Sequence, residues 1–189
     1  MRIIGGKLKG SNLHILRNQT IRPLKDMVRE SIFNLLTHSN IILFKFEKIN
    51  VLDLYSGTGS FGLECLSRDA SNVFFVENSN EAIEILKKNI EKLKLNKKIK
   101  IFSENTFQAI EKKEIYEKKF KLIFCDPPFK STNVEKLIKL IIEKDLLEKN
   151  GVIVLHRKKN SKENFPNEFK IIDERVYGIS KIIFGKIST

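Results

Sequence analysis

The chain has 189 residues, 41% of them hydrophobic, which is enough to bury the core of one globular domain. No apolar run approaches the roughly 18 residues that cross a membrane, and Met1 is followed at once by the charged Arg2, so we expect neither export nor membrane insertion. Cys65 and Cys125 lie in no CxxC or Cys/His cluster, which argues against a disulfide framework or a zinc site. These features favour a reducing cytoplasm.

The formal net charge is +12, from 35 basic and 23 acidic residues, and this excess favours a polyanionic partner. Because 28 of the basic residues are lysines, a composition bias of a whole proteome is the alternative explanation. The arginines are more informative, since four of the seven lie within the first 30 residues. We therefore expect residues 1–45 to form a basic arm and helix that contacts nucleic acid. The predicted contacts are Arg2, Lys7, Lys9, Arg22 and Arg29.

The elements predicted in chain order begin with two short strands around a glycine turn within 1–24, which form an arm outside the core, and an amphipathic helix over 24–36. Strands and helices then alternate. Strands are predicted over 49–55, 73–76, 99–102, 120–125 and 152–156, and helices over 61–68, 81–95, 106–112 and 134–147. Strands over 169–173 and 179–187 form a closing antiparallel hairpin. The pattern predicts one α/β domain, residues 1–189, with a mostly parallel Rossmann-like sheet covered by helices on both faces.

A glycine loop follows the first of these core strands. Gly57, Gly59 and Gly62 form a G-x-G-x-x-G between a strand and a helix, the arrangement typical of nucleotide-cofactor loops. Asp53 ends the strand, where its carboxylate would repel a dinucleotide's pyrophosphate but attract the ammonium and sulfonium of S-adenosylmethionine. Glu77 ends the next strand, where a carboxylate can accept both ribose hydroxyls. No G-K-[ST] follows, which excludes a P-loop NTPase.

The sequence Asp126-Pro127-Pro128-Phe129 directly follows another core strand, so it should face the same crevice as the glycine loop. The prolines restrict the backbone, so that the Asp126 carboxylate and the Pro127 carbonyl are held outward as hydrogen-bond acceptors. Phe129 offers a flat apolar face on which an extruded base can stack. This chemistry suits methyl transfer to an exocyclic amine. A carboxylate also matches the adjacent N1–H and N2–H donors of guanine, whereas adenine suits Asn better.

Together these motifs resemble class I S-adenosylmethionine-dependent amino-methyltransferases. The resemblance implies a cofactor site of Asp53, Ser56, Gly57, Gly59 and Glu77, with Asn105 contacting the adenine edge, and a catalytic set of Asp126, Pro127, Pro128 and Phe129.

The beginning of the chain narrows the resemblance further. Arg2-Ile3-Ile4-Gly5-Gly6, Ile21-Arg22-Pro23 and Val28-Arg29-Glu30 are similar to the bacterial 16S rRNA (guanine(966)-N2)-methyltransferase family. This implies an enzyme that acts on ribosomal RNA within an assembled small subunit. We further expect a cytoplasmic monomer that binds no metal.

Two alternatives stay open from the sequence: a DNA or RNA adenine-N6 methyltransferase, and a nucleic-acid-binding module of the same fold without catalysis. The histidines His14, His38 and His156 lie in three separate segments without metal spacing, and we assign them structural roles. Cys65 and Cys125 have no neighbouring base in the sequence that would activate a thiol, so neither is a predicted nucleophile.

Overall fold

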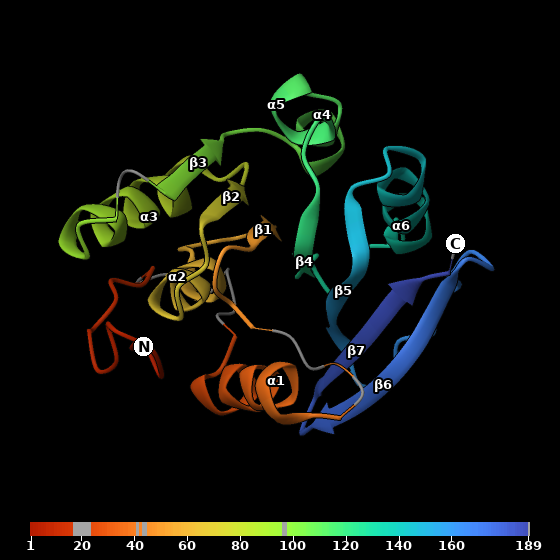
Figure 1. Ribbon diagram of the computed structural model, residues 1–189, viewed down its shortest axis with the longest axis horizontal. Helices are drawn as coiled ribbons and strands as arrows, with labels where there is room; N and C mark the ends of the chain where they lie inside the picture. The colour runs from red at the N-terminus through yellow and green to blue at the C-terminus, as the bar shows by residue number, and fades with distance from the viewer. Residues whose placement is uncertain (17–23, 41, 43–44, 96–97, 189) are drawn as a thin grey trace.

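The described chain folds around one mixed sheet with helices on both faces (Figure 1). The computed structural model describes residues 1–189 except 17–23, 41, 43–44, 96–97 and 189. The strands are β1 (Asn50–Leu54), β2 (Asn72–Val76), β3 (Ile99–Phe102), β4 (Phe120–Cys125), β5 (Leu147–Lys158), β6 (Phe169–Tyr177) and β7 (Ser180–Ile187). The helices are α1 (Asp26–His38), α2 (Ser60–Ser67), α3 (Asn80–Lys92), α4 (Thr106–Ile110), α5 (Lys113–Tyr116) and α6 (Val134–Glu143).

The strand order is β3-β2-β1-β4-β5-β7-β6, and strands β1 to β5 all run parallel. Strand β7 lies between β5 and β6 and pairs antiparallel with both. The predicted parallel sheet with a closing antiparallel hairpin is therefore confirmed. Because parallel strands end at one edge of the sheet, the segments that follow β1, β2, β4 and β5 lie close together.

The core is divided by the sheet into two layers. Successive side chains of a strand point to opposite faces, so Val51 packs under α1, α2 and α3 while its neighbour Leu52 packs under α4, α5 and α6. Strands buried on both faces need continuous apolar runs, and the central strands have them. This three-layer arrangement leaves the carboxyl edge of the sheet open to ligands.

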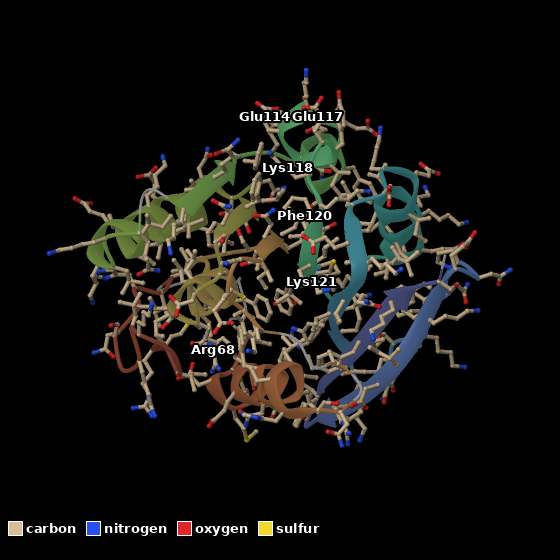
Figure 2. All side chains as sticks on the ribbon, viewed as in Figure 1. Arg68, Glu114, Glu117, Lys118, Phe120 and Lys121 are labelled. Atoms are coloured by element: carbon tan, nitrogen blue, oxygen red, sulfur yellow. The ribbon has the colours of Figure 1, made fainter. Side chains whose placement is uncertain are left out.

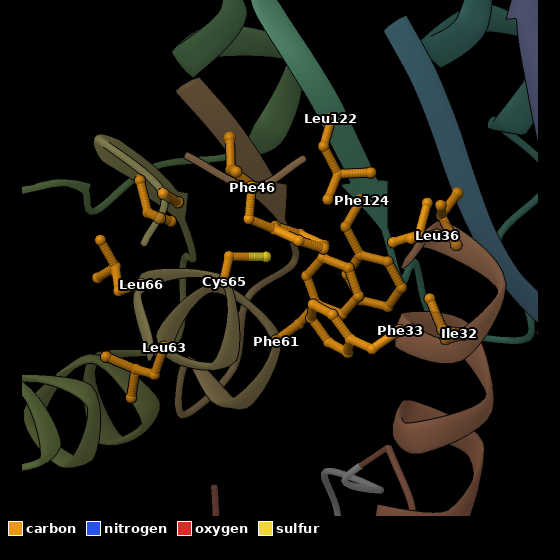
Figure 3. Packing of buried hydrophobic residues seen from close by; sticks show 14 of the residues in the cluster. Ile32, Phe33, Leu36, Phe46, Phe61, Leu63, Cys65, Leu66, Leu122 and Phe124 are labelled. Carbon is orange, nitrogen blue, oxygen red and sulfur yellow. The ribbon is translucent and has the colours of Figure 1, made fainter. Parts of the chain in front are cut away.

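An aromatic cluster attaches α1 to this edge (Figure 3). Phe61 of α2 stacks on Phe124 of β4 with ring centroids 3.8 Å apart and an interplanar angle of 8°. Phe33 of α1 lies 5.0 Å from the Phe61 ring and 5.4 Å from that of Phe46. Offset aromatic contacts of this kind contribute about 0.5 to 1.5 kcal/mol each beyond their buried area. The predicted amphipathic helix is confirmed, and its position follows from this packing.

The N-terminal segment differs from the predicted arm. Its two predicted strands are reduced to an isolated antiparallel bridge between Arg2 and Asn12. Ile3 and Leu13 are buried and belong to the core, so the expectation of an arm outside the core was wrong for this part. Glu64 of α2 explains the attachment, because its carboxylate accepts hydrogen bonds from the backbone N–H groups of Ile4 and Gly5, both at 2.7 Å.

Three predicted helices also differ in extent. The helix expected over 81–95 ends at Lys92, and Lys94 has a left-handed φ of 56°. The helix expected over 134–147 ends at Glu143, and Asp145 turns the chain with a left-handed φ of 48°. Leu147 then begins β5 and pairs with Phe120, which explains its apolar character without a helix. The helix expected over 106–112 ends at Ile110 and is followed by the short α5. Among the described residues, no helix combines the length and apolar character that a membrane crossing requires.

Candidate active site

A cavity of about 400 Å³ lies at the carboxyl edge of the sheet. Its walls come from the ends of β1, β2 and β4, the glycine loop, the buried strand β5 and apolar residues of the N-terminal region. Most of the predicted site lines this cavity. The predicted residues found there are Asp53, Ser56, Gly57, Glu77, Asp126, Pro127, Pro128 and Phe129. The volume falls within the range of small-molecule sites.

Two predicted cofactor residues do not line the cavity. Gly59 has a left-handed φ of 83°, and a Cβ there would lie 2.3 Å from Leu86 Cδ1, so the glycine is needed for the turn and for helix packing. Asn105 is exposed, and its Oδ1 accepts a hydrogen bond from Phe107 N at 2.9 Å as the N-cap of α4. Asn105 thus lies outside the residues that line this cavity, and its contact with the adenine stays a prediction.

Asp53 is the buried acid of the site. Its Oδ2 accepts a hydrogen bond from Gly62 N at 2.9 Å, whereas Oδ1 has no partner among the described residues. The pKa of Asp53 is raised to about 8, mainly by burial; the hydrogen bond from Gly62 opposes this rise, and the neighbouring Asp126 and Glu77 carboxylates contribute to it. The Ser56 hydroxyl is also buried without a partner in the described chain. Unpaired polar atoms at a cavity wall indicate a polar ligand.

Glu77 connects β2 to the glycine loop. Its Oε2 accepts a hydrogen bond from Gly57 N at 2.7 Å, and its Oε1 accepts from Asn78 N at 2.9 Å and Ser79 N at 2.8 Å. A carboxylate has about four acceptor positions, so about one remains for a hydroxyl group of a ligand. Glu77 thus both shapes the loop and presents an acceptor to the cavity.

The Asp126–Phe129 segment is held by strand β5. Asp126 Oδ1 lies 2.8 Å from His156 Nδ1, and the Phe129 ring contacts the His156 ring edge-on at 5.2 Å between centroids. Arg157 is buried and donates hydrogen bonds to the carbonyl oxygens of Pro128, at 3.0 Å, and Ser131, at 2.8 Å. The segment is therefore fixed by side chains that follow it by about 30 positions in the sequence.

The predicted basic contacts have different environments. Arg2 and Lys9 are exposed, and Lys7 is exposed beside Asp69 at the far end of α2 from the cavity. Arg22 lies outside the described residues. Arg29 is fully buried, where it binds the Arg2 carbonyl and lies 3.0 Å from Asp26 Oδ1, so its predicted contact with nucleic acid is wrong. A buried guanidinium that satisfies a carboxylate and a carbonyl cannot reach a phosphate.

Comparison with known proteins identifies relatives over nearly the whole chain. Residues 1–186 match the family described as "Conserved hypothetical protein 95". This chain belongs to that family. A relative in Bacillus subtilis, "Putative rRNA methyltransferase YlbH", is 31% identical over 98% of each chain. "Ribosomal RNA small subunit methyltransferase D" of Haemophilus influenzae is 29% identical over 95% of this chain and 90% of its own length.

A solved structure agrees with this membership of the Conserved hypothetical protein 95 family. "Putative methyltransferase yhhF" from Escherichia coli superimposes with a TM-score of 0.84 at 25% identity, over 100% of this chain and 98% of that one. The methyltransferase fold and the family resemblance predicted from the sequence are both confirmed.

Sequence reasoning missed two site residues of this family member. His156 was assigned a structural role, and Arg157 was assigned none, yet both hold the Asp126–Phe129 segment. The sequence carries little signal for Arg157, because it follows the apolar strand and begins the basic run Arg157-Lys158-Lys159, and only the structure shows that it is buried among backbone carbonyl groups. No group of three or more His, Cys, Asp or Glu suited to a metal ion occurs in the described part of the chain.

Proposed function

We propose that this chain transfers a methyl group from S-adenosylmethionine to the exocyclic N2 amine of a guanine in small-subunit ribosomal RNA. The observation that carries the proposal is the cavity itself, in which Asp53 and Glu77 face the Asp126–Phe129 segment. The carboxylates of Asp53 and Glu77 suit a cationic nucleoside cofactor. The Asp126–Phe129 segment suits a flat base with N–H donors. The relatives named as ribosomal RNA methyltransferases support the same assignment.

The cavity fits S-adenosylmethionine better than a dinucleotide. Three carboxylates, those of Asp53, Glu77 and Asp126, line one cavity, and their mutual repulsion contributes to the raised pKa of Asp53. A ligand with a positive ammonium and sulfonium relieves this repulsion, whereas a pyrophosphate would add to it. Asp53 Oδ1 and Ser56 Oγ, both unpaired in the described structure, can receive the amino acid part of the cofactor.

The target amine is held by the Asp126–Phe129 segment. The bound cofactor supplies a methyl group on a positively charged sulfur. Asp126 orients the guanine amine through its N–H groups, so that the nitrogen lone pair points at that methyl carbon. The new N–C bond forms as the C–S bond breaks, and sulfur keeps the electron pair. The surplus proton leaves the cationic nitrogen to the Asp126 carboxylate or to water. This step depends mainly on position and charge complementarity.

A methylation assay tests the proposed function. Small subunits and naked 16S RNA from cells lacking this activity are incubated with the purified protein and methyl-labelled S-adenosylmethionine, and the RNA is digested to nucleosides. We expect label in N2-methylguanosine, with more label from assembled subunits than from naked RNA. Label in N6-methyladenosine would instead support the adenine alternative, and binding of S-adenosylmethionine without transfer would support the silent binding module.

The proposal includes a cytoplasmic monomer that binds RNA through its exposed N-terminal cations. Replacing Arg2 and Lys9 together by alanine should remove about two phosphate contacts. The slope of log affinity against log salt should then fall by roughly 1.5. The measurement is subunit affinity across a salt series for wild type and the double variant.

A charge-matched control uses Lys113 and Lys118, which lie in or next to α5. Figure 2 places Lys118 far from Arg68, the residue beside which the N-terminal segment packs. Replacing both lysines by alanine should leave the salt slope unchanged. Equal slopes for the Arg2/Lys9 variant and wild type would mean that the positive charge of the segment reflects composition and not recognition.

Asp53→Asn should increase stability while weakening cofactor binding. The pKa of Asp53 is about 8 in the folded chain, against about 3.9 when unfolded, so the folded state binds the proton more tightly. Stability from this group is complete below about pH 4 and is lost as the pH rises through 8. At pH 8 the amide should therefore stabilise the free protein by about 5 kcal/mol. S-adenosylmethionine binding should weaken about tenfold.

Thermal unfolding and calorimetry at pH 6 and pH 8.5 check both effects. In the wild type, cofactor affinity should rise through pH 8 as Asp53 ionises, and this rise should be absent in Asp53→Asn. Asp173→Asn, a change in β6, serves as the control. A variant that is less stable than wild type at pH 8.5, or that binds the cofactor equally well, contradicts the assignment of Asp53.

A further inference from the structure

His156 lines the cavity and has no role in the methyl transfer described above. It is 4% exposed, and both of its ring nitrogens have partners. Nδ1 lies 2.8 Å from Asp126 Oδ1, and Nε2 lies 2.9 Å from Ser180 Oγ. The Phe129 ring packs edge-on against the imidazole. The ring orientation is therefore fixed from three sides.

Strand register explains why these side chains meet. Cys125 of β4 pairs with Leu155 of β5 in the parallel part of the sheet. The residues that follow them, Asp126 and His156, therefore lie side by side at the carboxyl edge. Ser180 begins β7, which pairs antiparallel with β5, and so approaches His156 from the other side. Three strands thus converge on one imidazole.

The hydrogen-bond chemistry of the partners determines which nitrogen carries the proton. An ionised carboxylate only accepts hydrogen bonds, so Nδ1 must donate to Asp126. Nε2 of a neutral ring is then an acceptor, and the Ser180 hydroxyl can donate to it. Every polar atom of the imidazole is satisfied in this arrangement. The bond to Nδ1 occupies Oδ1 of Asp126 and leaves Oδ2 for a ligand in the cavity.

We propose that His156 is a positioning residue for methyl transfer. Its Nδ1–H holds Asp126 Oδ1 and so turns Oδ2 toward the N–H groups of the target amine. This inference rests on the proposed function, because it concerns the amine that Asp126 holds. In this role His156 acts through Asp126 and exchanges no proton with the substrate. Its effect is to reduce the freedom of the Asp126 carboxylate before the base arrives.

Two amide substitutions separate positioning from packing. The amide nitrogen of His156→Asn can take the place of Nδ1 and keep the bond to Asp126, whereas that of His156→Gln takes the place of Nε2 and keeps only the bond to Ser180. We expect kcat to fall about tenfold or more in His156→Gln and His156→Ala, with S-adenosylmethionine Kd unchanged. His156→Asn should stay within about threefold of wild type. His38→Asn, which changes a histidine at the end of α1, is the control.

The measurements are kcat and KM for each substrate, cofactor Kd by calorimetry, and Tm for each variant. Wild-type turnover in His156→Ala overturns the inference, as does an Asn variant that is as slow as the Gln variant. Nitrogen-15 NMR of the free protein gives a readout that does not depend on activity. It should show the Nδ1-protonated ring, and an Nε2-protonated neutral ring also overturns the inference. Failure of the proposed function looks different, because the wild type itself then makes no N2-methylguanosine.

Discussion

Asp126→Ala is expected to lower kcat for methyl transfer about 10²-fold or more while leaving the Kd for S-adenosylmethionine nearly unchanged. The reason is the proposed division of the cavity, in which Asp126, held by His156 Nδ1, orients the target base, whereas Asp53 and Glu77 bind the cofactor. Single-turnover kinetics with assembled subunits measures the chemical step. Calorimetry with the same preparation measures cofactor binding.

Asp126→Asn keeps the size of the side chain and should also lose most of the rate, because the carboxylate uses Oδ1 for His156 Nδ1 and Oδ2 for the guanine N–H groups, whereas an amide has only one acceptor oxygen. Asp173→Ala, which removes a carboxylate from β6, controls for the change in charge. Turnover of either Asp126 variant within a few-fold of wild type would show that this carboxylate does not orient the target amine. A strong preference of Asp126→Asn for adenine would support the reading of Asp126 as the residue that selects the base.

Glu77→Ala is expected to weaken S-adenosylmethionine binding by about 1.5 to 3 kcal/mol, the scale of charged hydrogen bonds, which corresponds to roughly 10- to 150-fold in Kd. The structure gives two reasons for this loss. The variant removes an acceptor from the cavity, and it also frees the backbone N–H groups of Gly57, Asn78 and Ser79 that Glu77 now binds. The glycine loop should therefore lose both a ligand contact and its support.

Glu77→Gln is an intermediate case, because the charge is lost and its single amide oxygen can accept from Gly57 N or from Asn78 N and Ser79 N but not from both groups. It should bind the cofactor with intermediate affinity and have a Tm between those of wild type and Glu77→Ala. Calorimetry and thermal unfolding of the three proteins measure both quantities. Unchanged affinity in folded Glu77→Ala would remove Glu77 from the cofactor site.

The order of strands and helices could be predicted because each element carries its own periodicity. The strands over 120–125 and 152–156 are apolar at every position or nearly so, which is what a sheet covered on both faces requires. The end of α6 was missed because residues 144–147 keep a helical apolar spacing. Asp145 leaves the helix only because Leu147 pairs with Phe120 of the neighbouring strand. Local preference was overridden by a contact distant in sequence.

The charges of the N-terminal basic segment could also not be interpreted from local sequence alone. Arg2 and Arg29 are the same residue type in the same basic segment. In the structure, however, Arg2 is exposed, and Arg29 is buried against Asp26 and close to Glu64. The sequence alone does not predict which of these arginines forms an ion pair with a carboxylate in the folded chain. The prediction of a contact with nucleic acid therefore stays open for Arg2 and fails for Arg29.

The residues that contact a ligand and those that hold them in place differ in how they are encoded. Asp53–Gly59 and Asp126–Phe129 are contiguous motifs at strand ends, so their residue types and their place after a strand were enough to predict that they meet at one sheet edge. His156 and Arg157 form no motif, because their partners lie about 30 positions earlier and, for His156, also in β7. Only the register between β4, β5 and β7 brings these groups within hydrogen-bond distance, since a one-residue slip would turn each side chain to the opposite face of the sheet.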